Sequence, residues 1–281
     1  MTRVDIAHLR QWIGRREERG DLASVAPVRA LAATLDRDDT PINLPPLYHW
    51  LYFQPVVSMA EVGPDGHPAR GGFLPPVPLP RRMWVAGKMD FLRPVKLGEA
   101  IARVSTITDV TLKEGRVGPL VFVTVRHQIS LANGDLALTE TQDIVYRDAP
   151  PLDADTSVVK PAPADAQWRR EVRPDPVLLF RYSALTFNCH RIHYDRPYAV
   201  EVEGYPGLVV HGPLVATLLM DHLRRALPEA KVRTFEFRAV RPLFDARMFR
   251  LGAQPDGPGR IRLWAESAGG ALSMDALATL A

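Results

Sequence analysis

The sequence predicts an α+β protein in which two antiparallel sheets each wrap around a helix. A segment that begins at Pro213 is apolar on nearly every face over its first turns, as expected of a buried helix. Four strand-length segments follow it, at residues 231–241, 247–253, 260–267 and 271–280. A similar order, helices and then about four strands, comes before a proline-rich stretch near the middle of the chain. We therefore expect two halves built alike.

Length and composition agree with this organisation. The 281 residues suit one large or two modest domains, and 46% hydrophobic with 24% charged residues is typical of an ordered protein with a substantial core. The formal net charge is only +3, which does not indicate nucleic-acid binding but is compatible with an anionic ligand.

The chain has one cysteine, Cys189, so no intramolecular disulfide can form and a reducing compartment is expected. No apolar run approaches the length of a membrane span, and the polar first residues lack the core of a signal peptide. These features predict a cytoplasmic protein without a membrane partner.

Three helices are expected before the first strands. Residues 5–19 place Ile6, Leu9 and Ile13 on one face, and Gly20 is the expected stop. A second helix is expected at residues 27–35, behind an N-terminal proline. The aromatic segment 47–53 is predicted to be a short buried helix, the weaker counterpart of the helix at Pro213.

Residues 63–80 are rich in glycine and proline and predict a long loop, which in a compact domain is more often functional or a lid than accidental. Strands are expected after it at residues 82–92, 99–112, 120–131 and 136–146. Asn133-Gly134-Asp135 is a strong hairpin signal between the last two.

Residues 148–165 contain four prolines and no apolar periodicity, which indicates an extended linker. The domain prediction is a first half at 1–150, a linker at 151–165 and a second half at 166–281. Residues 91–98 and 237–243 look like one strand end and turn that occurs in both halves, each basic and bearing a proline.

The features of a catalytic site concentrate between residues 180 and 227. His190, His193 and His211 lie within a short span, and His211 comes just before Gly212-Pro213, where the long apolar helix begins. Backbone N–H groups at a helix start are free and attract negative charge. The histidine loop and the helix start are therefore expected to lie side by side.

Two short motifs here resemble those of a known family. The first is the run from Thr186 to Asp195, Thr-Phe-Asn-Cys-His-Arg-Ile-His-Tyr-Asp, and the second is His211-Gly212-Pro213-Leu214. They resemble the motifs of the MaoC-like hydratase/dehydratase family, in the variant typical of mitochondrial-type 3-hydroxyacyl-thioester dehydratases and bacterial mesaconyl-CoA and itaconyl-CoA hydratases. Asn188 stands where the broad family has an aspartate, and His190-Arg191 where it has Asn-Pro.

The resemblance covers most of the chain and implies a double hot-dog fold, with the catalytic loop in the second half only. The first half would then supply the acyl pocket and a packing surface. The implied activity is reversible hydration of a 2-enoyl thioester, or dehydration of a 3-hydroxyacyl thioester, without a metal or redox cofactor.

The residues themselves suit this chemistry. Hydration needs a base for water, an acid for the alpha carbon and donors for the thioester oxygen; His193 is the expected base, and the N–H of Gly212 the expected oxyanion donor. An amide such as Asn188 can only donate and accept hydrogen bonds. Either Asn188 positions water while His193 makes both proton transfers, or another carboxylate, such as Asp195, takes part. The first reading is preferred.

Four arginines and one histidine are candidates for substrate binding, since guanidinium groups suit phosphates and carboxylates: Arg181, Arg191, His211, Arg238 and Arg241. A thiol mechanism at Cys189 is disfavoured, because sequence neighbours rarely face each other as a dyad. A metal site is not expected, since the histidines lack a zinc-ligand pattern.

The first expectation for the substrate is a short dicarboxylic acyl group, such as itaconyl or mesaconyl, on coenzyme A. A general 3-hydroxyacyl-thioester dehydratase of fatty-acid metabolism is the closest alternative. A hot-dog acyl-CoA thioesterase, which normally uses a carboxylate, and a non-catalytic acyl-thioester binding module are further alternatives. The sequence leaves open the carrier, coenzyme A or acyl carrier protein, and assembly into a homo-oligomer.

Overall fold

A single antiparallel sheet of ten strands forms the frame of the protein. The computed structural model describes residues 4–39, 41–115, 118–148 and 159–281. Among these residues the strands are β1 (Arg16–Leu22), β2 (Arg81–Phe91), β3 (Ala100–Gly115), β4 (Gly118–Leu131), β5 (Leu136–Arg147), β6 (Trp168–Val172), β7 (Val232–Ala239), β8 (Phe249–Pro255), β9 (Arg260–Ser267) and β10 (Leu272–Leu280). Their order across the sheet is β1-β3-β4-β5-β2-β7-β10-β9-β8-β6.

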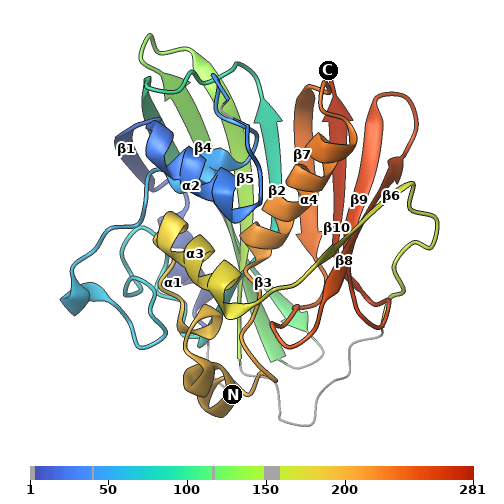
Figure 1. Ribbon diagram of the computed structural model, residues 1–281. Helices are drawn as coiled ribbons and strands as arrows, with labels where there is room; N and C mark the ends of the chain where they lie inside the picture. Colours follow the sequence, from blue (N-terminus) through green and yellow to red (C-terminus); the bar gives the residue numbers. More distant parts are fainter. Residues whose placement is uncertain (1–3, 40, 116–117, 149–158) are drawn as a thin grey trace.

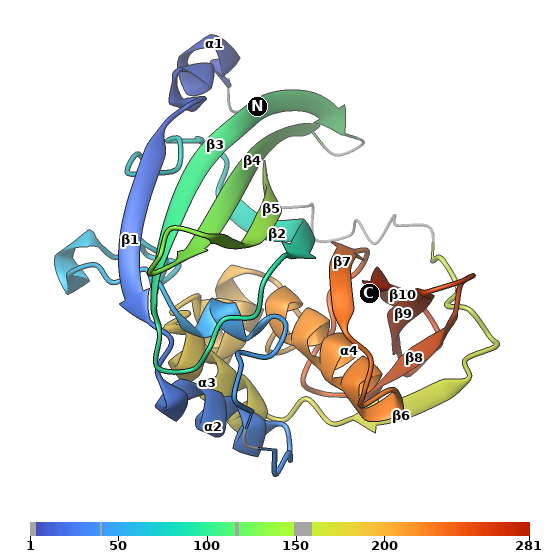
Figure 2. The same ribbon diagram turned by 90° about the horizontal axis from the view of Figure 1, so that it is seen from above.

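This strand order contains the same pattern twice. The sequence β1-β3-β4-β5-β2 on one side is matched by β6-β8-β9-β10-β7 on the other, and the two patterns join where β2 pairs antiparallel with β7. Figure 2 shows the result as two arcs of strands. The predicted α+β architecture is therefore confirmed, with the two expected antiparallel sheets joined at β2 and β7 into one.

The helix α4 (Gly212–Ala226) lies in the concave side of the second arc (Figures 1 and 2). Every residue from Leu214 to Leu223 is buried, as the all-round apolar pattern predicts. The strands β7 to β10 begin and end within two residues of the predicted segments, and β8 lies two residues later at both ends. The prediction was therefore correct in both type and order for α4 and the four strands after it.

The helices of the first half differ from the prediction in two places. Residues 5–19 do not form one helix: α1 (Ile6–Leu9) continues as the 3-10 turn η1 (Arg10–Trp12), and the chain then enters strand β1. Residues from Arg16 onward pair with β3, so long-range strand pairing overrides the local helical pattern. The helix α2 (Val25–Thr34) forms as predicted, two residues early.

The second difference is the segment 47–53. It forms only the 3-10 turn η2 (Tyr48–Leu51), although its side chains are buried as expected. This short turn lies between α2 and β2, where the second half has α4 between α3 (Pro176–Thr186) and β7. Two prolines before it and Pro55 after it leave no room for a longer helix.

The predicted repeat of a strand end and turn is seen in matching hydrogen bonds. After β2, the N–H groups of Leu92 and Arg93 both donate to the carbonyl of Ala137; after β7, those of Val240 and Arg241 both donate to the carbonyl of Ser273. The hairpin at residues 133–135 also forms, with Gly134 at φ 87°, a value that favours glycine.

Residues 149–158 of the predicted linker lie outside the described residues. The rest of it is extended and lies along the turn before β10, where the N–H of Ala162 donates to Gly270 and the N–H of Leu272 donates to Lys160. The structure also contains elements that the sequence did not predict: β6, α3, the 3-10 turns η3 (Met59–Glu61) and η4 (Arg191–His193), and the π-helix η5 (Tyr198–Val202).

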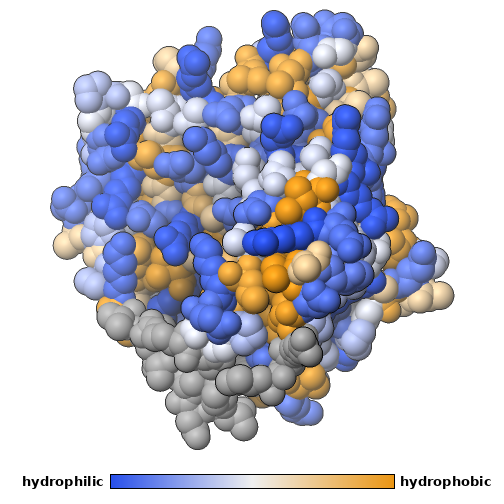
Figure 3. Space-filling view, turned by 180° about the vertical axis from the view of Figure 1, so that it is seen from behind, coloured by the Kyte–Doolittle hydropathy of each residue, from blue (hydrophilic) through white to orange (hydrophobic). Residues whose placement is uncertain are grey.

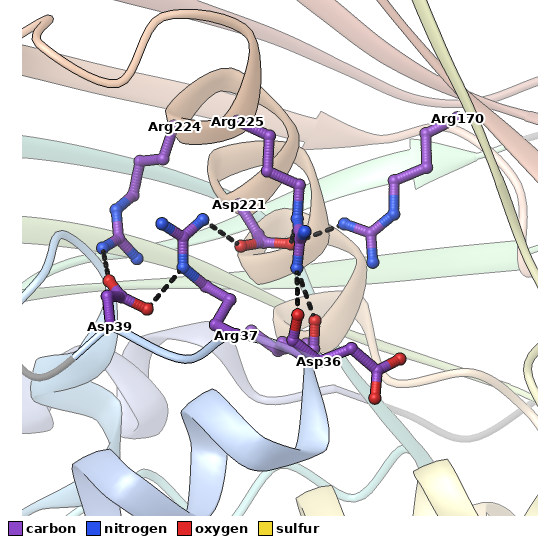
Figure 4. A network of polar contacts seen from close by, with 8 residues as sticks. Asp36, Arg37, Asp39, Arg170, Asp221, Arg224 and Arg225 are labelled. Atoms are coloured by element: carbon purple, nitrogen blue, oxygen red, sulfur yellow. Dashed lines mark hydrogen bonds and ion pairs between the residues drawn. The ribbon is translucent and has the colours of Figure 1, made fainter.

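A network of arginines and aspartates joins α4 to the segment after α2 and to β6. Asp221, which is 1% exposed, accepts from Arg37, Arg170 and Arg225. Figure 4 shows the three guanidinium groups around this one carboxylate. Because a buried carboxylate needs such partners, the network holds α4 against the first half.

No helix in the described part of the chain is both long and apolar enough to cross a membrane.

Candidate active site

Three imidazole rings of the second half lie in contact at the start of α4. His193 ends η4, and His211 is the N-cap residue of α4. Their rings are stacked, with 3.7 Å between centroids and 21° between planes. The ring of His190 meets that of His193 edge-on, with centroids 5.3 Å apart. The predicted juxtaposition of histidine loop and helix start is therefore present.

His193 has a buried ring with one bonded and one free nitrogen. Its Nδ1 lies 2.7 Å from the carbonyl oxygen of Val209, which can only accept, so Nδ1 carries the proton and Nε2 of the neutral ring has a free lone pair. Burial lowers the pKa of His193 to about 4, although the hydrogen bond to Val209 acts in the opposite direction. The ring is thus neutral at physiological pH.

His211 is completely buried and bonded on one side only. Its Nε2 lies 2.8 Å from Oγ of Ser183 in α3, and the ring of Tyr182 packs edge-on against it. Its Nδ1 is buried without a hydrogen-bond partner in the described structure. A buried polar atom of this kind calls for a ligand or water.

The start of α4 supplies backbone donors beside these rings. Gly212 is the first helical residue and Pro213, the second, has no N–H, while the N–H of Val215 already donates to the carbonyl of His211. The N–H groups of Gly212 and Leu214 have no acceptor within the helix. They are the donors available to an oxyanion at this end.

Asn188 shapes the loop that carries the histidines. It follows Phe187, which ends α3 in the left-handed conformation with φ 50°, and its N–H donates to the carbonyl of Ser183. Its side-chain Oδ1 accepts from the N–H of His190 at 3.0 Å. The side chain thus holds the turn before His193, and its carbonyl oxygen is already engaged.

A second pair of residues comes from the first half of the chain. The ring of His67 lies 4.1 Å from that of His190, and Asp65 holds His67 through two bonds, from the backbone N–H to Oδ1 at 3.0 Å and from Nδ1 to Oδ2 at 3.1 Å. The sequence marked the loop 63–80 as functional but singled out neither residue. The signal was an aspartate and a histidine two residues apart within it.

Backbone contacts fasten this loop to the histidine loop. The N–H of Arg191 donates to the carbonyl of Asp65 at 2.9 Å, and its Nη1 donates to the carbonyl of Pro64 at 3.1 Å. Gly66, with φ 88°, lies so close to Cys189 that a Cβ atom there would be 1.8 Å from the Cys189 carbonyl oxygen. Only glycine fits this approach.

Asp65, His67 and His190 also lie within the range at which side chains share a cation, with donor atoms less than 4.8 Å apart. Asp65, however, already accepts both bonds from His67, and after burial the positive charge of Arg82 is the next largest cause that lowers the pKa of His67. The three residues thus form a group joined by hydrogen bonds between Asp65 and His67 and by a tilted ring contact between His67 and His190.

The predicted substrate arginines are not gathered here. Arg191 donates from Nε and Nη2 to Asp195 and lies over the ring of Tyr198, so its guanidinium is already engaged. Asp195 in turn accepts from the N–H of Tyr198, which gives this carboxylate a structural role in the loop. Arg181 is exposed on α3.

Arg238 and Arg241 lie at β7 and just after it. Arg238 is exposed on the face of the sheet opposite to Phe237, whose ring packs into the core, so it lies on the other side of the sheet from His193. It lines a groove of about 780 Å³ on that outer face. Figure 3 shows the molecule from behind, where hydrophilic residues predominate. This groove is remote from the histidines. Arg241 is partly buried beyond the strand.

Cys189 is exposed, and its Sγ lies 3.7 Å from the carbonyl oxygen of Phe187. No hydrogen bond from the thiol to a histidine is seen among the described residues.

Comparison with solved structures defines the fold. A MaoC-like dehydratase from Phytophthora capsici superposes with a TM-score of 0.69 at 14% identity, over 99% of both chains. A Mycobacterium tuberculosis protein described as having a double hot-dog fold superposes with a TM-score of 0.59 at 15% identity, over 96% of both chains. The predicted double hot-dog fold is confirmed.

Sequence comparison identifies the family. A family model described as hydroxyacyl-thioester dehydratase type 2 matches residues 47–245, and mesaconyl-C(4)-CoA hydratase of Chloroflexus aurantiacus is 49% identical over 276 residues, 96% of each chain. The fold and the histidine site thus define a hydratase or dehydratase of the hot-dog class. The chain belongs to the hydroxyacyl-thioester dehydratase type 2 family, and the predicted hydro-lyase class is the class of that family.

Proposed function

We propose that this protein catalyses the reversible hydration of a 2-enoyl-CoA thioester with a short dicarboxylic acyl group, of the mesaconyl or itaconyl kind. The observation that carries the proposal is the neutral, buried His193, whose Nδ1 is bonded to Val209 and whose ring stacks on that of His211, the residue before Gly212. The similarity to a mesaconyl-C(4)-CoA hydratase along nearly the whole chain supports the acyl group.

The reaction follows from this arrangement. His193 Nε2 takes a proton from water, and the water oxygen bonds to C3 of the enoyl group. The electron pair of the double bond moves toward the thioester, where the N–H of Gly212 stabilises the charge on oxygen; losing one such donor typically costs about 2.7–4 kcal/mol. The imidazolium then returns its proton to C2, so that one group serves as base and acid.

His211 and Asn188 have supporting roles in this scheme. His211 packs its buried ring against that of His193 and is held by Ser183, so it fixes the position of the base at the start of α4. Asn188 keeps the loop in place through the N–H of His190, and its amide group can still hold water. Hydration changes no net oxidation state, and these groups supply the acid, the base and the donors. We therefore propose that it needs no redox cofactor or metal.

The distal carboxylate requires a cation near the histidines. Arg191 is occupied by Asp195, whereas the charge of Arg82 in β2 acts on His190 and His67. We propose Arg82 as the partner of that carboxylate, because a guanidinium can bind it through two bonds. The exposed, unpaired thiol of Cys189 supports a reducing compartment, the cytoplasm, as the place of reaction.

The family match also supports a second reading, dehydration of an uncharged 3-hydroxyacyl thioester. A panel of enoyl-CoA substrates separates the two, with hydration followed by loss of the conjugated absorbance and by a mass gain of one water. Release of free thiol without that gain would indicate a thioesterase instead. His193→Gln should lower kcat on the best substrate by about a hundredfold or more, while His8→Gln, at an exposed position in α1, should leave it unchanged.

Substrate charge is tested on the same panel. Mesaconyl-CoA or itaconyl-CoA should exceed crotonyl-CoA by at least about tenfold in kcat/KM, which corresponds to about 1.4 kcal/mol. Arg82→Met should remove this preference and spare crotonyl-CoA, whereas Arg181→Met, at the exposed arginine of α3, should keep it. A wild-type preference for long, uncharged chains would support the dehydratase of fatty-acid metabolism.

A further inference from the structure

The site contains a carboxylate that the histidine loop itself lacks. Asn188 cannot carry a charge, and Asp195 is bonded to Arg191 and to the N–H of Tyr198. Asp65 comes from the opposite half of the chain, yet it is linked to His193 through two rings: His67, which it holds, and His190, which lies between His67 and His193.

We propose that Asp65 and His67 are positioning residues of the active site. His67 holds the ring of His190 against that of His193, and Asp65 supplies a negative charge that stabilises the imidazolium formed on His193. The inference rests on the proposed function, since the imidazolium arises when His193 takes a proton from water.

The geometry of the pair supports an orienting role. Asp65 accepts from both the backbone and the ring of His67, so the ring cannot rotate without losing a bond. Burial would raise the pKa of Asp65, but the hydrogen bonds from His67, with the positive charge of Arg82, lower it below its ordinary value. The carboxylate is therefore ionised, Nδ1 of His67 carries the proton, and Nε2 is left free.

Backbone contacts between the loop that carries Asp65 and His67 and the histidine loop fix this pair of residues in the site. The N–H of Arg191 donates to the carbonyl of Asp65, and Gly66 packs against Cys189, so the residues on both sides of His190 contact the loop of the first half. An aspartate that orients a histidine, which in turn contacts the reacting imidazole, can contribute much of the rate, because the transient positive charge then forms in a prepared environment.

The experiment compares Asp65→Asn and His67→Gln with Glu61→Gln. Glu61 is an exposed carboxylate in the same segment, bonded only to Ser58 in its own short turn among the described residues. Both site variants should lower kcat by about tenfold or more and change KM less than threefold, because the charge matters only after proton transfer. The control should stay within twofold. The double variant should be no slower than the slower single one, since the two residues act as a unit.

A second arm does not need a substrate. Long-range 15N NMR of the imidazole rings should show His67 as the Nδ1–H tautomer in the wild-type protein and a mixture of tautomers in Asp65→Asn.

Retained kcat in both site variants, or an effect on KM alone, would overturn the proposal while leaving hydration established. If the wild-type chain hydrates no enoyl thioester, the proposed function fails instead. An unchanged tautomer of His67 in Asp65→Asn would show that Asp65 does not orient this ring. Loss of wild-type activity on chelation, with recovery on adding Zn²⁺, would show that the group is a cation site and would also overturn the proposal.

Discussion

Gly66 in the loop of the first half and Cys189 in the histidine loop touch backbone to backbone: a Cβ atom on Gly66 would lie 1.8 Å from the carbonyl oxygen of Cys189. This contact sets the distance between His67 and the rings of the second half. Adding one methyl group at Gly66 should therefore move the loop, which makes its position testable.

Gly66→Ala should move the loop and lower kcat by about tenfold, because the new Cβ atom clashes with backbone and φ 88° is unfavourable for alanine, by about 1 kcal/mol or more. Gly72→Ala is the matched control in the same loop, since its Cβ atom would meet nothing within 4 Å. Steady-state hydration by the two variants, with thermal melts, provides the comparison. Equal activity of both would mean that the loop position does not matter for catalysis.

Asn188→Asp should leave activity similar or lower it. Aspartate can still accept from the N–H of His190, so the turn is kept, and Asp65 already places a carboxylate near the histidines. Turnover is measured across the enoyl-CoA panel beside Asn188→Ala, which loses the turn and should be worse. A large gain in Asn188→Asp would instead reveal a site limited by the missing carboxylate.

The buried histidines should make the fold less stable in acid. The pKa of His193, and likewise that of His127 in the first half, is lowered to about 4, so between pH 6.5 and 4 the unfolded chain binds protons that the folded chain excludes. The free energy of unfolding should therefore fall as pH drops through this window, by about 2 kcal/mol for each such histidine between pH 7 and 5.

Urea unfolding at the two pH values measures this effect. His193→Gln should show a smaller loss than the wild type, because one of the excluded protons is no longer involved. An identical pH dependence of both proteins would contradict the assignment of His193 as a neutral buried ring.

Asp221→Asn should destabilise the protein by about 3 kcal/mol or more, because it leaves Arg37, Arg170 and Arg225 around a neutral group in a buried position. Asp256→Asn, which breaks an exposed pair with Arg260, should cost no more than about 1 kcal/mol. Chemical denaturation at pH 7 compares the two. A small effect at Asp221 would show that α4 is held by apolar packing alone.

Much of this molecule can be predicted from local sequence. The apolar run after Pro213, the alternating segments of β7 to β10, and the turn at Asn133-Gly134 depend on residues close together in the chain, where periodicity and turn chemistry apply. The same holds for the histidine loop and the helix start, since a short motif carries its own geometry. The sequence also led to the family and to the hydro-lyase class.

Tertiary structure decided what depends on contacts between distant segments. Pairing with β3 makes a strand of Arg16–Leu22 where the local pattern favours a helix, and the alternation of β7 turns Arg238 away from the site. The approach of Gly66 to Cys189 brings Asp65 and His67 to a histidine more than a hundred residues away. No local pattern encodes that approach, because it results from the docking of two halves whose strands meet where β2 pairs with β7.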